Sequence, residues 1–300
     1  MIMQAGVVSE LSFISELHPL TVMGYFIELF TLLLLFNHLI LVIGIFISLI
    51  GICCFYFDSQ KVRRLLISSL SFMGIIFVFN LVLNQTGRRL VWQWHFMNWE
   101  FNLTESGVIY GLTMALSLGA MIVAFVWFNG VMTIPKISYI LFPIVPRLAM
   151  LLTISLRLVD LFVQKMERLV MLQKNRNIII SEGSFRQRLK STGRLLRIVL
   201  IDGVSDSMET AVLMEARGFG ARKRSQYQRF GFQIADGIFL VVATGLFGLL
   251  ILARLQGWGW TSDVVMVQWQ RAHDWSLVGL LIVFIGLPLI GEGGYRLWAN

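Results

Sequence analysis

The sequence is poor in charged residues and in the residue types that usually build catalytic or metal centres. Only 14% of its 300 residues are charged, against about 25% in soluble domains, and 57% are hydrophobic. The only cysteines, Cys53 and Cys54, are adjacent in an apolar run, which suits neither a disulfide framework nor a zinc site. The four histidines, at positions 18, 38, 95 and 273, lack the spacing of metal ligands. This composition predicts an integral membrane protein without a bound metal.

Several functional motifs are absent as well. The sequence has no glycine-rich phosphate loop of the Walker type, so we do not expect it to hydrolyse ATP by that route. Neither Gly-x-Ser-x-Gly nor His-Glu-x-x-His occurs, and no paired carboxylates stand in an apolar run. The N-terminus also lacks the pattern of a cleaved signal peptide. These absences predict a protein that is not an enzyme and has no cofactor.

Long apolar runs predict about six membrane-spanning helices. The run from 20 to 57 would form a helix of about 57 Å, which is too long for a hydrocarbon core of about 30 Å, so we expect two spans that meet at Asn37-His38. The predicted spans are 20–36, 39–57, 65–83, 106–128, 233–252 and 276–298, the last with a kink at Pro288. The loops 84–104 and 254–275 are rich in tryptophan, which suits the headgroup level or contact with a membrane partner.

A basic segment separates the fourth span from the fifth. Residues 129–231 contain 17 Lys and Arg but only 7 Asp and Glu. Binding to nucleic acid could account for such a block, but the positive-inside rule accounts for it more simply, so we expect no nucleic-acid partner. This segment and the basic loop 58–64 are then cytoplasmic, as are both termini. The fold class is therefore predicted to be all-α and polytopic, with membrane domains 1–128 and 232–300 around a cytoplasmic helical domain, 129–231.

Two long amphipathic helices are expected in the cytoplasmic domain. Pro135, Pro143 and Pro146 should break the chain before the first helix, 147–174, and the second helix, 185–217, should be broken near Asp202-Gly203. Basic residues recur every three or four positions along the second helix and share one face, for which a solvated or headgroup-facing stripe is the simplest interpretation. They are Arg186, Lys190, Arg194 and Arg197.

One acidic residue, Glu28, lies inside a predicted span. A carboxyl group in the membrane is costly and therefore is a functional candidate. The alternative interpretation is that Glu28 is paired with another helix for structural reasons.

The stretch 214–220, Met-Glu-Ala-Arg-Gly-Phe-Gly, holds the main candidate site. Gly218 can adopt positive φ and end the second helix, and Arg217 then lies where the unpaired carbonyl groups favour a cation. An exposed arginine at a rigid helix end suits an acidic socket on a partner. A capped helix with a merely solvated arginine is the alternative.

The chain resembles the transmembrane (T) component of energy-coupling factor transporters, a branch of the ATP-binding-cassette superfamily that imports vitamins and metals. The stretch Met214–Phe219 is similar to the Ala-Arg-Gly signature at the end of a coupling helix in that family. The resemblance covers nearly the whole chain and includes His18-Pro19 and the arrangement of four spans, a helical domain and further spans. A first arginine motif is expected near 173–177, where Arg176 is flanked by asparagines in place of small residues.

The resemblance implies a bacterial plasma-membrane subunit that docks two cytoplasmic ATPases and holds a small substrate-binding membrane (S) subunit. The expected ATPase-docking residues are Arg176 and Glu215 to Gly218, with Arg217 at the centre. Two other functions stay open: a conventional ABC permease that lines its own pathway, and a membrane scaffold or enzyme without transport activity.

Overall fold

The computed structural model describes residues 13–83, 90–96, 99–175, 185–218, 230–258 and 272–299. The chain divides into two compact units, which are described separately here. The membrane unit comprises the described residues up to Thr133 and those from Phe230 onwards. The helical unit comprises those from Ile134 to Arg229.

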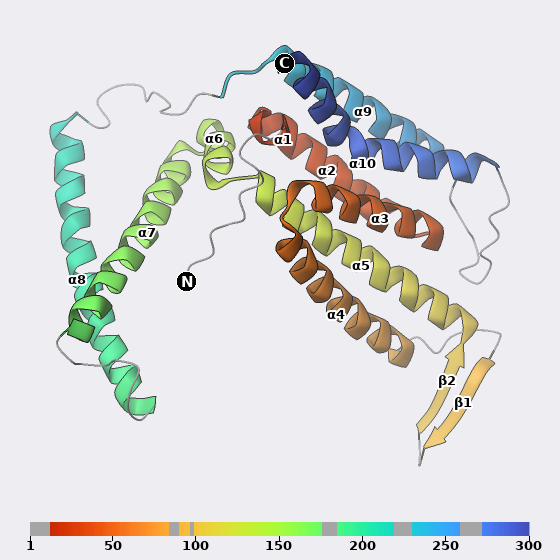
Figure 1. Ribbon diagram of the computed structural model, residues 1–300, viewed down its shortest axis with the longest axis horizontal. Coiled ribbons are helices and arrows are strands. Elements are labelled where there is room, and N and C mark those ends of the chain that lie inside the picture. Colours follow the sequence, from red (N-terminus) through yellow and green to blue (C-terminus); the bar gives the residue numbers. More distant parts are fainter. Residues whose placement is uncertain are drawn as a thin grey trace. The chain divides into compact units, whose positions relative to one another are not determined.

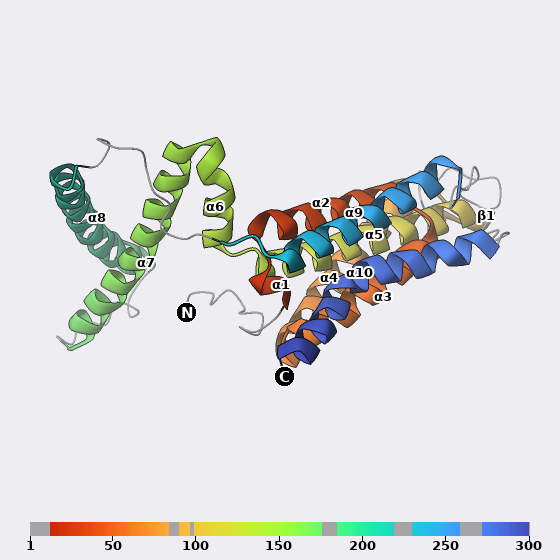
Figure 2. The ribbon, with the colours of Figure 1, turned by 90° about the horizontal axis from the view of Figure 1, so that it is seen from above.

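The membrane unit is a bundle of helices that lie side by side in Figures 1 and 2. Five of them are long and apolar enough to cross a bilayer, α3 (Leu39–Tyr56), α4 (Ser59–Leu83), α5 (Glu105–Val131), α9 (Ile234–Leu255) and α10 (Ala272–Ala299). The apolar helix α2 (Pro19–Leu35) has 17 residues, or about 26 Å, and the short α1 (Phe13–Glu16) precedes it. The chain is therefore an all-α, multi-pass membrane protein, as predicted, apart from one short hairpin.

Two segments that we expected to be loops form regular secondary structure instead. The segment before α5 contains strands β1 (Leu90–Phe96) and β2 (Trp99–Thr104), which pair in antiparallel register. Most of the expected loop 58–64 belongs to α4, which begins at Ser59. A helix can continue past the apolar run because its backbone hydrogen bonds are internal, so the membrane boundary need not end it.

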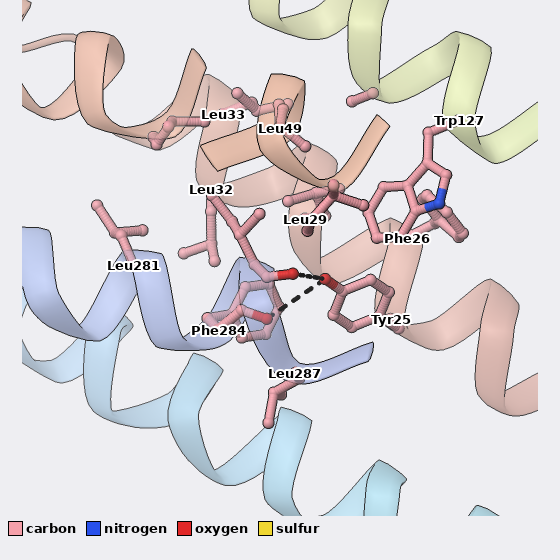
Figure 3. Close-up of a cluster of buried hydrophobic side chains, with 14 of the residues drawn as sticks. Tyr25, Phe26, Leu29, Leu32, Leu33, Leu49, Trp127, Leu281, Phe284 and Leu287 are labelled. Carbon is pink, nitrogen blue, oxygen red and sulfur yellow. Dashed lines mark hydrogen bonds between the residues drawn. The ribbon is translucent and has the colours of Figure 1, made fainter. Parts of the chain in front are cut away.

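Aromatic side chains fill the centre of the membrane unit (Figure 3). Tyr25 and Phe26 of α2 pack against Trp127 of α5, and Tyr25 also stacks on Phe284 of α10. Pro288 lies inside α10 and has no N–H for the carbonyl group of Phe284 four residues earlier. The Tyr25 hydroxyl donates to the carbonyl oxygens of Phe284 and Ile285 at 3.3 and 3.1 Å. Pro288, at which we predicted a kink, thus leaves a carbonyl group without its helical donor, and a hydroxyl group from another helix donates to that carbonyl instead.

A buried carboxylate joins the beginning of α9 to the beginning of α2. Asp236 accepts hydrogen bonds from the backbone N–H groups of His18 at 2.6 Å and Gln233 at 2.8 Å. With Gln233 it forms a capping box, which satisfies N–H groups at the start of α9. This junction fixes the place where the chain re-enters the membrane unit.

The helical unit consists of α6 (Ile134–Ile144), α7 (Pro146–Asn175) and α8 (Phe185–Ala216). We expected three prolines to break the chain ahead of α7, but two of them, Pro135 and Pro143, lie within α6, and only Pro146 marks a break, at the first position of α7. α6 folds back beside α7, and α7 crosses α8 in both views (Figures 1 and 2). α7 and α8 are about 45 and 48 Å long.

Candidate functional site

The C-terminal end of α8 presents Arg217 as predicted. The helix ends at Ala216, and Gly218 has a φ of 72°, in the left-handed region that a glycine adopts without strain. The N–H of Arg217 donates to the Leu213 carbonyl at 3.1 Å, and that of Gly218 donates to the Glu215 carbonyl at 2.9 Å. These bonds close the last turn, so the backbone on both sides of Arg217 has a defined geometry.

All four residues at this end, Glu215, Ala216, Arg217 and Gly218, are exposed within the structure. A guanidinium group stays charged at cellular pH and can bind a carboxylate through two parallel hydrogen bonds. It also lies where the carbonyl ends of the helix attract a cation. The end of α8 can therefore offer another molecule an accessible positive charge, carried on a backbone of defined geometry.

The same helix carries the predicted basic stripe. Arg186, Lys190, Arg194 and Arg197 are all exposed, as expected for a solvated or headgroup-facing row. Their spacing places them along the N-terminal half of α8, well away from Arg217. Arg186, Arg194 and Arg197 therefore provide exposed arginines on the same helix, away from its C-terminal end.

α8 crosses α7 without the break that we predicted at Asp202-Gly203. Leu195 and Val199 are buried, and Gly203 continues their row one turn later. A Cβ atom at Gly203 would overlap the ring of Phe162 on α7. The glycine thus serves the close approach of the two helices, and it does not interrupt the helix. We call this row with Phe162 the crossing seam.

An ion pair joins the two helices beside the crossing seam. The Nζ of Lys165 on α7 lies 2.7 Å from Oδ2 of Asp202 and 2.6 Å from Oδ2 of Asp206 on α8. Hydrogen bonds to Asp202 and then to Asp206 raise the pKa of the Lys165 ammonium group. Because an ammonium group has three donors, one lysine can hold two carboxylates one turn apart.

The sequence analysis did not identify this pairing. The available signal was weak: Asp202 and Asp206 are four residues apart and therefore share a face of a helix. Lys165 lies 37 and 41 residues away from them, and no local pattern relates it to either aspartate.

The remaining candidates are placed as follows. Arg176 lies outside the described residues, so its role as a first docking arginine stays a prediction. Cys53 is buried and Cys54 is exposed, and both are free thiols. Among the described residues, no three His, Cys, Asp or Glu side chains converge as metal ligands would.

Glu28 is paired at one oxygen only. Its Oε1 accepts a hydrogen bond of 2.8 Å from the Thr244 hydroxyl of α9. Its Oε2 is buried and has no hydrogen-bond partner in the described part of the chain. The structural pairing that we considered is therefore real but incomplete.

Comparison with known proteins adds a family relationship. The sequence profile of CbiQ, described as cobalt transport protein, matches residues 12–228. The energy-coupling factor transporter transmembrane protein EcfT of Staphylococcus aureus is 26% identical over 265 residues, which cover 82% of this chain and 94% of that protein. The EcfT of Acidaminococcus fermentans is 27% identical over 65% of this chain and 75% of its own length. That of Listeria innocua is 31% identical over 37% of this chain and 42% of its own length.

Proposed function

Because the chain belongs to the CbiQ family of transport proteins, we propose that it is the transmembrane coupling component of an energy-coupling factor importer. In this role it does not hydrolyse ATP. Two cytoplasmic ATPase subunits supply the movement, and the chain passes it to a small membrane subunit that captures a vitamin or a transition metal. The names of the relatives and the resemblance of residues 214–219 to the family signature support this assignment.

The observation that carries the proposal is the exposed Arg217 on the capped end of α8. We propose that its guanidinium group docks into an acidic groove of one ATPase and that Arg176 docks on the other. Glu215, Ala216 and Gly218 would line the contact that Arg217 makes. When such a contact is desolvated, loss of the arginine leaves the partner's carboxylate unpaired, which typically costs about 2–5 kcal/mol.

In the proposed orientation, the helical unit and both termini lie in the cytoplasm. The excess of basic residues between 129 and 231 supports this orientation through the positive-inside rule. A cysteine placed at Leu189, which is 65% exposed, should then react with an impermeant thiol reagent only after the cells are opened. Labelling in intact cells would refute the orientation.

The docking role is tested by reversing the charge of Arg217 in the chain expressed with its ATPases and membrane partners. Arg217→Glu should abolish co-purification of at least one ATPase and leave membrane insertion intact. The control is Arg194→Glu, the same charge reversal at an exposed position of the same helix. Equal ATPase recovery with the two variants would refute the docking role.

Arg217→Ala should weaken ATPase binding by about 30-fold or more, the equivalent of about 2 kcal/mol. We expect Arg176→Ala to impair coupled uptake less, because asparagines replace the small residues that usually flank this motif. A small third membrane subunit in the purified complex would distinguish this importer from a permease that lines its own pathway. Failure to recover any ATPase would favour a function outside transport.

A further inference from the structure

A polar pair lies in the middle of the helices α2 and α9, which pack against each other. Glu28 is nine residues from the start of α2, or about 13 Å, and Thr244 is ten residues from the start of α9, or about 15 Å. Both positions are therefore far from either end of an apolar helix. Val241, one turn before Thr244, is 72% exposed, so this part of the bundle surface is open. In a bilayer this surface meets hydrocarbon or another membrane protein.

Hydrogen bonding at this pair is incomplete. The single hydroxyl hydrogen of Thr244 is donated to Oε1 of Glu28 at 2.8 Å. The hydroxyl of Thr31, one turn along α2, is donated to the Ile27 carbonyl at 2.8 Å. Oε2 of Glu28 is buried without a partner in the described part of the chain. A carboxyl oxygen that lacks a partner is costly in protein and more so at membrane depth, so a further donor is expected.

The surface beside Glu28 and Thr244 carries no bulky side chain at two positions of α9, so another helix can approach it closely. Gly245 and Gly248 follow Thr244 on α9, and a Cβ atom added at either would meet nothing within 4 Å. Small residues at such positions let the backbones of two membrane helices approach closely. Close approach would bring a side chain of the second helix within reach of Glu28.

We propose that the Glu28 seam, which consists of Glu28, Thr244, Gly245 and Gly248, binds a transmembrane helix of a partner membrane protein. That helix donates a side-chain hydrogen bond, from a hydroxyl, amide or amine, to Glu28, whose half-buried side chain turns Oε2 outward when the partner binds. The identification of this partner as the substrate-binding membrane subunit rests on the proposed function. The seam itself rests on the geometry of α2 and α9.

Other occupants of the Glu28 seam fit the chemistry less well. Acyl chains of lipids have no hydrogen-bond donor for Oε2. A second copy of this chain, joined by two-fold symmetry, would place the same seams against each other, and two carboxyl groups at one contact repel unless they share a proton. A donor from a different protein satisfies the oxygen without that conflict.

The first test is photo-crosslinking in the complete transporter in native membranes. A benzophenone amino acid at Val241 should form a crosslink to the small membrane subunit that co-purifies with the ATPases, identified by mass spectrometry. The same probe at Ile47 of α3, which is 63% exposed, should not. A crosslink from Val241 to a second copy of this chain, or to lipid alone, would overturn the proposal.

The second test changes the carboxyl group. Glu28→Leu should lower the amount of the small membrane subunit per ATPase about three- to tenfold, as expected for one interhelical hydrogen bond. Glu28→Gln keeps an acceptor oxygen and should stay within about twofold of the wild type, and Thr31→Val should have no effect because its hydroxyl is bonded within α2. Full retention of the subunit by Glu28→Leu would overturn the proposal.

The seam and the proposed function can fail separately. With Arg217→Glu at least one ATPase should be lost while the Val241 crosslink to the small membrane subunit persists. If the wild-type chain binds no ATPase at all, the proposed function fails, and a crosslink to a membrane partner would still support the seam.

Discussion

Gly218 allows the docking geometry to be tested without changing any charge. Its φ of 72° is in the left-handed region, where a residue with a Cβ atom is strained. A Cβ added there would meet nothing within 4 Å in the structure, so the cost of Gly218→Ala in the isolated chain lies in the backbone alone. That cost is about 1 kcal/mol, and a β-branched residue should cost about 2 kcal/mol. If Arg217 must be held in the capped conformation to bind, the strain will appear as lost affinity.

The expected losses follow from these energies. Gly218→Ala should weaken ATPase binding about fivefold and Gly218→Val about 30-fold. Gly218→Asn should stay within about twofold of the wild type, because asparagine tolerates the left-handed region better than other residues that carry a Cβ atom. Binding of the purified ATPase pair to the chain in nanodiscs, followed by biolayer interferometry, measures all three values.

Two results would refute this reasoning. If Gly218→Val binds as tightly as the wild type, the cap does not position Arg217 for binding. If Ala and Asn cause equal, large losses, the ATPase surface requires the absence of a side chain, and φ is not the cause. A control is Gly193→Ala, within α8 and in open space, which should strengthen the helix by about 1 kcal/mol and leave docking unchanged.

Two further predictions concern contacts between helices. Lys165→Met should broaden the distance distribution between spin labels at Leu172 of α7 and Leu189 of α8, both exposed. Because the pKa of Lys165 is raised, its contribution should be fully present from neutral pH up to the unfolded lysine value of about 10.4 and be lost as the pH rises through the folded value, so wild type and variant should converge in strong base. Tyr25→Phe should destabilise the membrane unit by about 1–3 kcal/mol in tryptophan-monitored unfolding, because the Phe284 carbonyl loses its donor. Pro288→Ala restores an N–H within α10, so the double variant should lose less stability than the two single losses combined, and simple additivity would contradict this account.

The membrane helices could be predicted from the sequence because their signal is local. An apolar run must form helix in a bilayer, where each backbone group needs an internal partner. The hairpin of β1 and β2 was missed because the tryptophans of 84–104 were interpreted as headgroup anchors or partner contacts in a loop. Alternation of apolar and polar residue types in 92–96 was available as a strand signal.

The candidate site divides in the same way between local and distant causes. The helix end at Gly218 was predictable, since a glycine directly after an arginine at the end of an amphipathic pattern is a local stop signal. The break expected at Asp202-Gly203 was wrong, because the reason for that glycine is the ring of Phe162 on another helix. Lys165 could not be paired with Asp202 and Asp206 until the crossing of α7 and α8 was known.

The helical unit leaves apolar surface exposed that other molecules must cover. Large apolar side chains stay exposed on both long helices, for example Met171 at 66% on α7 and Ile201 at 62% and Met208 at 66% on α8. Two helices that cross at one seam can bury only the faces that meet there, so the other apolar faces require a membrane surface or a partner protein.

In the proposed function the crossing seam then has a mechanical consequence. From Asp206 to Arg217 is about 16 Å along α8, and from Asp202 back to Phe185 is about 26 Å. A tilt of α8 about the contact with Lys165 therefore moves its N-terminal end by more than the displacement of Arg217. A stiff α8, an undisturbed Gly203 and an intact ion pair are all needed for this. Coupling of this kind therefore requires α8 to be continuous at Gly203, where the sequence suggested a break.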